Sequence, residues 1–161
     1  MPDLLVKLYD LPDPSPRLEQ LRLQGIHIRR AMAYEKQQVV DWVQQHFGPN
    51  WASECDVAFR QHPFACHIAT ADSQVVGFAC FDSASRGFFG PLGVAESARS
   101  NGIGAALLLT SLHAMADSGY AYAVIGGVES TAFYAEVVEC MEIPGSTPGI
   151  YADRLIRKEQ A

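Results

Sequence analysis

The sequence has few basic residues and no long apolar run, and each lack excludes a class of protein. Its 161 residues include 12 Lys and Arg against 18 Asp and Glu, which gives a formal net charge of −6. Binding to a phosphate backbone relies on clustered Lys and Arg, so we expect no nucleic-acid partner. No run approaches the ~18 apolar residues of a membrane span, and the N-terminus has neither a basic leader nor a cleavage site. We therefore expect a cytoplasmic protein with no membrane partner.

The cysteines and histidines lack the spacing of a metal site. Cys55, Cys66, Cys80 and Cys140 form no Cys-x-x-Cys pair. Three of them stand among apolar neighbours, where a free thiol behaves as a small hydrophobic side chain. The histidines show no helical His-x-x-x-His pairing with a carboxylate. The sequence therefore predicts no metal and no disulfide framework.

The composition that remains is typical of one soluble globular domain. Apolar residues make up 48% of the chain and charged residues 19%, enough to bury a core. Residues 1–25 contain four prolines and a short apolar stretch at 4–9. We predict that residues 1–25 form an N-terminal extension packed on the domain, which spans residues 26–161.

Hydrophobic periodicity predicts alternating helices and strands after residue 25. Helices are predicted over 34–47, 51–60, 105–116 and 131–138, the second beginning near Ser53 as its N-cap. Strands are predicted over 26–31, 65–71, 75–81, 88–94 and 122–128, with 65–71 and 75–81 forming a hairpin. Residues 141–144 and 150–156 are predicted as a closing strand pair. Because 88–128 reads as a βαβ unit, the fold class is α/β with a mixed sheet.

The most informative segment runs from Gly93 to Ala105, from a predicted strand into a long apolar helix. Its connecting loop contains Arg99, Gly102 and Gly104. A glycine-containing loop at a helix start binds phosphate groups through backbone N–H groups. The loop lacks the third glycine of a Rossmann fingerprint and the Gly-Lys-Ser/Thr of a P-loop, which excludes both. A phosphate-bearing cofactor is therefore the first hypothesis.

This segment resembles motif A of the Gcn5-related N-acetyltransferases (GNAT), whose pyrophosphate loop reads Arg/Gln-x-x-Gly-x-Gly/Ala. The order of elements over 26–156 is also similar to that fold, which implies a central mixed, splayed β-sheet flanked by helices. The resemblance implies acetyl-CoA as cosubstrate, with no metal. The residues that would bind it in the loop are Arg99, Ser100, Asn101, Gly102, Ile103, Gly104 and Ala105. The loop departs from the family pattern because it lacks one glycine and a nearby basic side chain.

The same resemblance assigns roles on both sides of this loop. In the family, the strand corresponding to Leu92, Gly93 and Val94 splays from the next strand and leaves a V-shaped cleft for the pantetheine arm. A backbone N–H there can stabilise charge on the carbonyl oxygen. Phe133-Tyr134 looks like the family's Phe-Tyr motif, although the usual Lys or Arg does not follow. The motif implies that Tyr134 protonates the departing thiolate.

A general base is not singled out by spacing. Any carboxylate whose pKa is raised by burial could deprotonate an ammonium. The candidates are Glu54, Asp56, Glu96 and Glu129. We rank Glu54 first because it follows Trp51 in the region that forms the acceptor pocket in relatives. The apolar residues that we expect to line this pocket are Trp51, Phe59, Phe88 and Tyr151.

These observations predict an N-acetyltransferase that moves an acetyl group from acetyl-CoA directly to a primary amine of a small molecule or peptide. A non-catalytic acyl-CoA-binding or sensor module is an alternative, against which Tyr134 argues. A structural or interaction protein also stays open, because fold alone never proves activity. The acidic net charge could steer a cationic amine without identifying it. A homodimer is left open as well.

Overall fold

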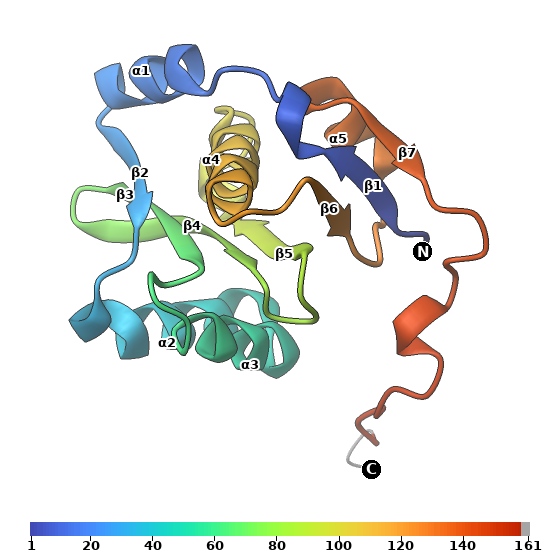
Figure 1. The fold of residues 1–161 in the computed structure, drawn as a ribbon. Coiled ribbons are helices and arrows are strands. Elements are labelled where there is room, and N and C mark those ends of the chain that lie inside the picture. Colours follow the sequence, from blue (N-terminus) through green and yellow to red (C-terminus); the bar gives the residue numbers. More distant parts are fainter. Residues whose placement is uncertain (159–161) are drawn as a thin grey trace.

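A mixed sheet of seven strands runs through the computed structural model, which describes residues 1–158 (Figure 1). The strand order is β2-β3-β4-β5-β6-β1-β7. The strands are β1 Leu4–Lys7, β2 Ile26–Arg30, β3 Cys66–Ala71, β4 Gln74–Phe81, β5 Phe88–Val94, β6 Tyr122–Ile125 and β7 Cys140–Glu142. The β5–β6 pair is parallel and the other pairs are antiparallel. The predicted α/β class is confirmed; the last three residues of the predicted domain lie outside the described residues.

Helices cover both faces of the sheet (Figure 1). They are α1 Ser15–Leu23, α2 Lys36–Phe47, α3 Pro49–Ala58, α4 Ile103–Asp117 and α5 Thr131–Val137. A Cβ at Gly77 of β4 would lie 3.1 Å from Leu107 of α4. A Cβ at Gly93 of β5 would instead lie 2.5 Å from the ring of Phe47, at the end of α2. The helix α4 therefore packs on one face, and α2 with α3 on the other.

The core centres on α4, whose side chains are buried almost all round. Leu107, Leu108, Leu112 and Met115 are fully buried, as expected for a helix that is apolar on every side. The helix packs on the sheet and also contacts α1. In the part of the chain that the structure describes, no helix is both long and apolar enough to span a membrane.

Most predicted elements are confirmed, but the start of α3 is not where Ser53 would place it. Gly48 ends α2 with φ 94° and serves as the N-cap of α3, which begins at Pro49. Proline suits the first helical position because its missing N–H would have no partner there and its φ is already helical. The predicted stop after Phe47 is confirmed.

The predicted closing strand pair is wrong in its second member. β7 forms close to the predicted 141–144, whereas Gly149–Tyr151 is a short 3-10 helix and residues 152–158 contain no strand. The strand beside β7 is β1, where Leu4 pairs with Ile125 of β6 on one side and Glu142 of β7 on the other. β1 lies between β6 and β7 and takes the place beside β7 that we predicted for residues 150–156. The apolar stretch at 4–9 gave no indication of this position.

The chain after β6 bonds to the N-terminal residues rather than to β5. The N–H of Gly127 donates to Oδ1 of Asp3 at 2.8 Å, and that of Val128 donates to the carbonyl of Pro2 at 2.9 Å. These bonds direct residues 127–128 away from β5. The N-terminal segment therefore fixes where the two parallel strands part.

We predict that shortening a buried side chain of β1 destabilises the whole domain. Val6 is fully buried, so Val6→Ala should lower the free energy of unfolding by about 2 kcal/mol through lost burial and a residual cavity. Leu23→Ala is the control because Leu23 is 74% exposed, and it should change stability by less than about 0.5 kcal/mol. Urea denaturation of both variants measures the difference. Equal stabilities would contradict the position of β1.

Candidate active site

One edge of β5 is largely unpaired. β5 pairs with β4 as far as Val94 but with β6 only at Phe88 and Phe89. The N–H of Ala95 donates to Val76 at 2.8 Å. Because backbone groups alternate in direction along a strand, the N–H groups of Leu92 and Val94 point away from β4, and that of Gly93 points toward it. The predicted splay is confirmed, and two backbone donors face the side from which β6 diverges.

The loop before α4 has the geometry of an anion site. Ser100 and Gly102 have left-handed φ values of 70° and 81°. The N–H of Ala106 donates to the carbonyl of Gly102 at 3.1 Å as the first bond of the helix. The N–H groups of the first turn therefore have no acceptor within the helix. These donors belong to Ile103, Gly104 and Ala105. They are available to phosphate oxygens at the positive end of the helix dipole.

One side chain ties this loop to the end of β5, and a second bonds within the loop. Nε of Arg99 donates to the carbonyl of Val94 at 3.3 Å, and Nδ2 of Asn101 donates to the carbonyl of Ala98 at 3.4 Å. Arg99 is the single basic residue between Val94 and Ala105, and it is exposed. Its role here is to shape the loop while its other N–H groups remain at the surface.

Tyr134 is held next to this loop by a ring that packs on a glycine. A Cβ at Gly104 would lie 3.3 Å from the ring of Phe133, and the rings of Phe133 and Tyr134 are edge to face with centroids 5.0 Å apart. The Tyr134 hydroxyl makes no hydrogen bond within residues 1–158. Burial raises the pKa of Tyr134 to about 12, so the phenol stays protonated and can donate.

Phe47 and Trp51 connect β5 to Glu54 on the opposite face of the sheet. The Phe47 ring covers Gly93, and the rings of Phe47 and Trp51 have centroids 5.1 Å apart. Trp51 and Glu54 are three residues apart on α3 and therefore neighbour each other on its surface. The glycine at position 93 is needed because any Cβ there would collide with the Phe47 ring.

Asp56 and Phe59, two other residues of the predicted base and pocket sets, have different partners. The Asp56 carboxylate pairs with Lys36 at 2.9 Å and with Arg60 at 3.1 Å. The hydrogen bond from Lys36 lowers the pKa of Asp56, which makes it a weaker base. Phe59 is buried against Phe64, with ring centroids 5.4 Å apart, and is a core residue.

Glu54 differs from the remaining carboxylates because it is half-buried. Glu96 and Glu129 are exposed, whereas burial raises the pKa of Glu54. No hydrogen bond or ion pair holds its carboxylate among the described residues. A carboxylate with a raised pKa and free oxygens is suited to accept a proton.

Tyr151 lies close to Glu54 and to the end of β6. A Cβ at Gly126 would lie 3.0 Å from both the Tyr151 hydroxyl and the Phe88 ring, so a side chain there would require these groups to shift by a few tenths of an ångström. Burial raises the pKa of Tyr151, and the negative charges of Glu54 and Asp3 raise it further. The 3-10 helix near the C-terminus therefore brings a phenol to the carboxylate of α3.

Sequence analysis did not place Phe47 or Asp3 near this site. Phe47 belonged to the apolar stripe of a predicted helix, and no signal distinguishes a ring that covers a strand from a core ring. Asp3 is buried, and its N–H donates to Oγ of Ser146 at 2.8 Å while Oδ1 accepts from Gly127. An acidic residue beside Pro2 gives no indication of contacts so distant in sequence.

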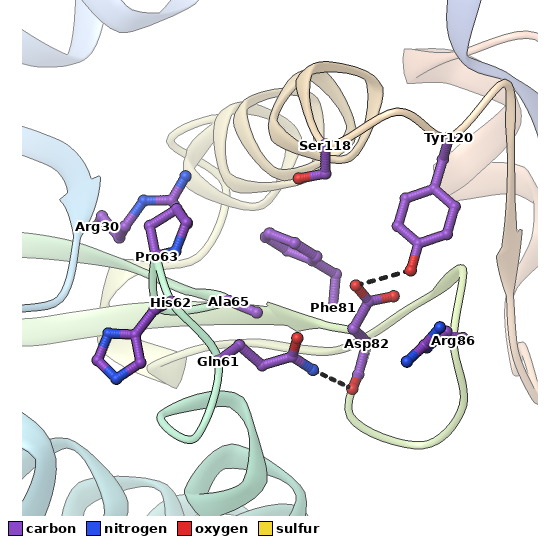
Figure 2. A pocket seen from close by; sticks show the side chains of 10 residues that line it. All are labelled: Arg30, Gln61, His62, Pro63, Ala65, Phe81, Asp82, Arg86, Ser118 and Tyr120. Atoms are coloured by element: carbon purple, nitrogen blue, oxygen red, sulfur yellow. Dashed lines mark hydrogen bonds between the residues drawn. The ribbon is translucent and has the colours of Figure 1, made fainter.

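A separate hollow of about 250 Å³ lies at the other end of α4 (Figure 2). The Tyr120 hydroxyl donates to Oδ2 of Asp82 at 3.0 Å, and Nε2 of Gln61 donates to the Asp82 carbonyl at 2.9 Å. Ser118 and Tyr120, which follow α4, help to line it. The loop of residues 95–102, which we call the anion loop, precedes that helix. None of the predicted site residues lines this hollow.

Comparison with models of protein families identifies the family of this chain. The model of the Acetyltransferase (GNAT) family matches residues 34–137, which include α2, α3, the splayed strands, the anion loop and Tyr134. The chain belongs to this GNAT family. A search of the curated proteins finds no match.

Solved structures share the GNAT fold with this chain at low identity. A GCN5-related glucosamine N-acetyltransferase region of a fungal multi-domain GH3 β-N-acetylglucosaminidase has a TM-score of 0.70 at 17% identity, covering 88% of this chain and 20% of that one. A GCN5-related N-acetyltransferase from Sphaerobacter thermophilus has a TM-score of 0.68 at 18% identity, covering 88% and 48%. A GNAT acetyltransferase from Brucella melitensis, in complex with acetyl-CoA, has a TM-score of 0.52 at 19% identity, covering 73% and 87%. The chain spans about half or less of the first two.

We predict that the glycine before α4 is required for CoA binding. Gly102 has φ 81°, and a Cβ there would meet no atom within 4 Å. Gly119 follows the C-terminal end of α4, has φ 102°, and a Cβ there would also meet no atom within 4 Å. Valine at either position strains the backbone by about 1–2 kcal/mol, but only Gly102→Val distorts the anion loop. Calorimetric titration with CoA should show at least about a tenfold loss of affinity, or 1.4 kcal/mol, for Gly102→Val.

The variant Gly119→Val controls for strain and should keep the affinity of the unaltered protein. Unchanged CoA affinity in folded Gly102→Val would remove the loop from the site. Gly104→Val should also weaken binding, but it is a less selective test because Phe133 packs against that glycine.

Proposed function

We propose that this GNAT protein transfers an acetyl group from acetyl-CoA directly to a primary amine of a small molecule or a peptide. The observation that carries the proposal is the open edge of β5, which presents two backbone N–H groups between an anion loop and two unpartnered proton-transfer groups. Acetyl-CoA supplies the reaction with an activated thioester. The chain supplies binding, orientation and proton transfer.

Binding is assigned to the backbone of β5 and of the loop that follows it. The first-turn N–H groups of α4 suit a diphosphate, and the residues fit such a group because these donors have no acceptor within the helix and follow Gly102, whose φ is left-handed. The N–H groups of Leu92 and Val94 suit a carbonyl oxygen, where a preorganised donor stabilises developing negative charge. The residues present therefore fit an acyl thioester with a diphosphate.

Proton transfer is assigned to Glu54 and Tyr134. An amine attacks only in its neutral form, so a base must take one proton from the ammonium, directly or through water. Glu54 is suited to this because burial raises its pKa and it has no partner among the described residues. Tyr134 keeps its proton because burial raises its pKa to about 12, and it can donate that proton to the departing thiolate.

A cationic acceptor is favoured by the charges around the end of β6. Glu54 and Asp3 both raise the pKa of Tyr151, so two carboxylates act on one phenol. A positively charged amine would be attracted by this group, while Trp51 and Phe88 offer apolar contacts. The identity of the amine is a matter for screening.

The activity is tested by two measurements on the same protein. Calorimetry with acetyl-CoA tests binding, and release of free CoA with a panel of amines, including glucosamine, polyamines and peptides, tests transfer. We expect binding together with amine-dependent CoA release. Binding without release for any amine would support the alternative of a non-catalytic acyl-CoA-binding module.

We predict that Tyr134→Phe reduces turnover rather than binding. Loss of a general acid should lower kcat about a hundredfold, while KM for acetyl-CoA should change by less than about threefold because the ring remains. Tyr9→Phe is the control, since Tyr9 is 66% exposed at the far end of β6, beside Tyr122. A fully active Tyr134→Phe enzyme would assign the proton to water or to another donor.

We predict that Glu54→Gln makes activity more dependent on a high pH. Below the pKa of the amine most acceptor is protonated, so loss of the base should cost about a hundredfold near neutral pH and much less near pH 9. In the unaltered enzyme, activity should fall as pH drops through the Glu54 pKa, which lies above its ordinary value; the variant should lack this step. Glu96→Gln, at an exposed carboxylate, controls for lost charge. Identical pH–rate profiles for Glu54→Gln and the unaltered enzyme would refute the role.

A further inference from the structure

Three cysteines that are distant in sequence meet in the core between α3 and the sheet. Cys55 lies on α3, Cys66 on β3 and Cys80 on β4. Their sulfur atoms all lie within 4.8 Å of one another, and all three residues are fully buried. Cys66 and Cys80 are direct cross-strand partners. The fourth cysteine, Cys140, lies on β7 and is half-buried outside this cluster.

The surroundings of the thiols are apolar. Ala52 and Ala58, one turn before and after Cys55, are buried. The positive charge of Arg30, which donates to the carbonyl of Phe64, acts on Cys66 and favours its thiolate, whereas Asp56 pairs with Lys36. A net charge placed among the thiols would still lie in buried, apolar surroundings, which costs free energy.

The three thiols differ in their pKa values because they interact with one another. Hydrogen bonds from Cys66 and Cys80 lower the pKa of Cys55 to about 5. Donation to Cys55 raises the pKa of Cys66, and burial raises that of Cys80. The cluster thus holds protons on Cys66 and Cys80, and a centre that replaces these two protons and neutralises the Cys55 thiolate would leave no net charge.

Geometry and charge together select the kind of centre. With sulfur–metal bonds of about 2.3 Å, the sulfurs of one coordination shell lie about 3.8 Å apart, which the 4.8 Å limit of this cluster allows. Zn²⁺ takes four ligands in structural sites, and three thiolates around it would leave one negative charge in the core. A trivalent centre held by three thiolates is neutral and needs no fourth ligand.

We propose that Cys55, Cys66 and Cys80 form a binding site for a trivalent thiophilic centre, of which arsenous acid is the probe. Arsenous acid carries three hydroxyl groups on arsenic. Three As–S bonds form and three As–O bonds break, and the hydroxyls leave as three waters with the protons of Cys66 and Cys80 and one proton from solvent, because Cys55 reacts as a thiolate. No oxidant or reductant is needed, because arsenic and sulfur keep their oxidation states. The proposal is independent of acetyl transfer.

Binding would join α3 to the two strands of the β3–β4 hairpin. Since the sulfurs are fully buried, entry requires transient opening of α3, and we expect slow uptake. Once formed, the three bonds would tie α3 covalently to the two strands of the hairpin, which already pair with each other. The bound protein should therefore unfold at a higher temperature.

The test uses the full chain, reduced with a phosphine rather than a dithiol, because dithiols compete for arsenic. After incubation with arsenite, intact mass should rise by one arsenic atom less three hydrogens, and X-ray absorption should give three sulfur neighbours. Cys140→Ala should bind as well as the unaltered protein. Cys55→Ala, Cys66→Ala and Cys80→Ala should each lose at least about tenfold in affinity, equivalent to 1.4 kcal/mol.

No mass gain in the unaltered protein would overturn the proposal. Loss of uptake in Cys140→Ala, or fewer than three sulfur neighbours around arsenic, would do so as well. If a core variant fails to fold, the sulfur count in the unaltered protein decides, because it needs no substitution.

Discussion

The candidate site depends on how little of β5 pairs with β6. These parallel strands share a register only at residues 88–89, while β5 continues along β4 to Val94. The chain after β6 turns to the N-terminal segment, where Gly127 donates to Asp3. Because these bonds are made elsewhere, the outward N–H groups of β5 have no strand beside them. Donors left open in this way can bind a ligand, and the family match gives that ligand its class.

Two chains of ring contacts position the proposed reacting groups around that edge. On one face, Gly93 admits the Phe47 ring, which leads through Trp51 to α3 and its half-buried carboxylate. On the other face, Gly104 admits the Phe133 ring, which carries Tyr134. In both cases a glycine allows a ring to approach the backbone closely. Such glycines shape the candidate site through the rings that pack on them.

Local elements were predictable from the sequence, and long-range pairing was not. The βαβ unit and the 65–81 hairpin follow from runs of apolar residues with clear turn signals between them. The place of β1 does not, since a strand of four residues does not specify a partner more than a hundred residues away. Residues 150–156 show why periodicity alone fails: it does not identify the partner strand, and β7 pairs with β1 instead. The thiol cluster was missed because spacing rules describe local ligands, although the predicted hairpin already placed Cys66 near Cys80.

Amide hydrogen exchange at β5, followed by NMR with and without acetyl-CoA, tests the central claim most directly. In the free protein, the N–H groups of Leu92 and Val94 should exchange fast because no strand accepts them, while those of Gly93 and Ala95 should be protected by β4. Saturating acetyl-CoA should protect Leu92 and Val94 and leave the other two unchanged. Slow exchange at Leu92 and Val94 in the free protein, or no change on adding acetyl-CoA, would contradict an open edge that binds the thioester.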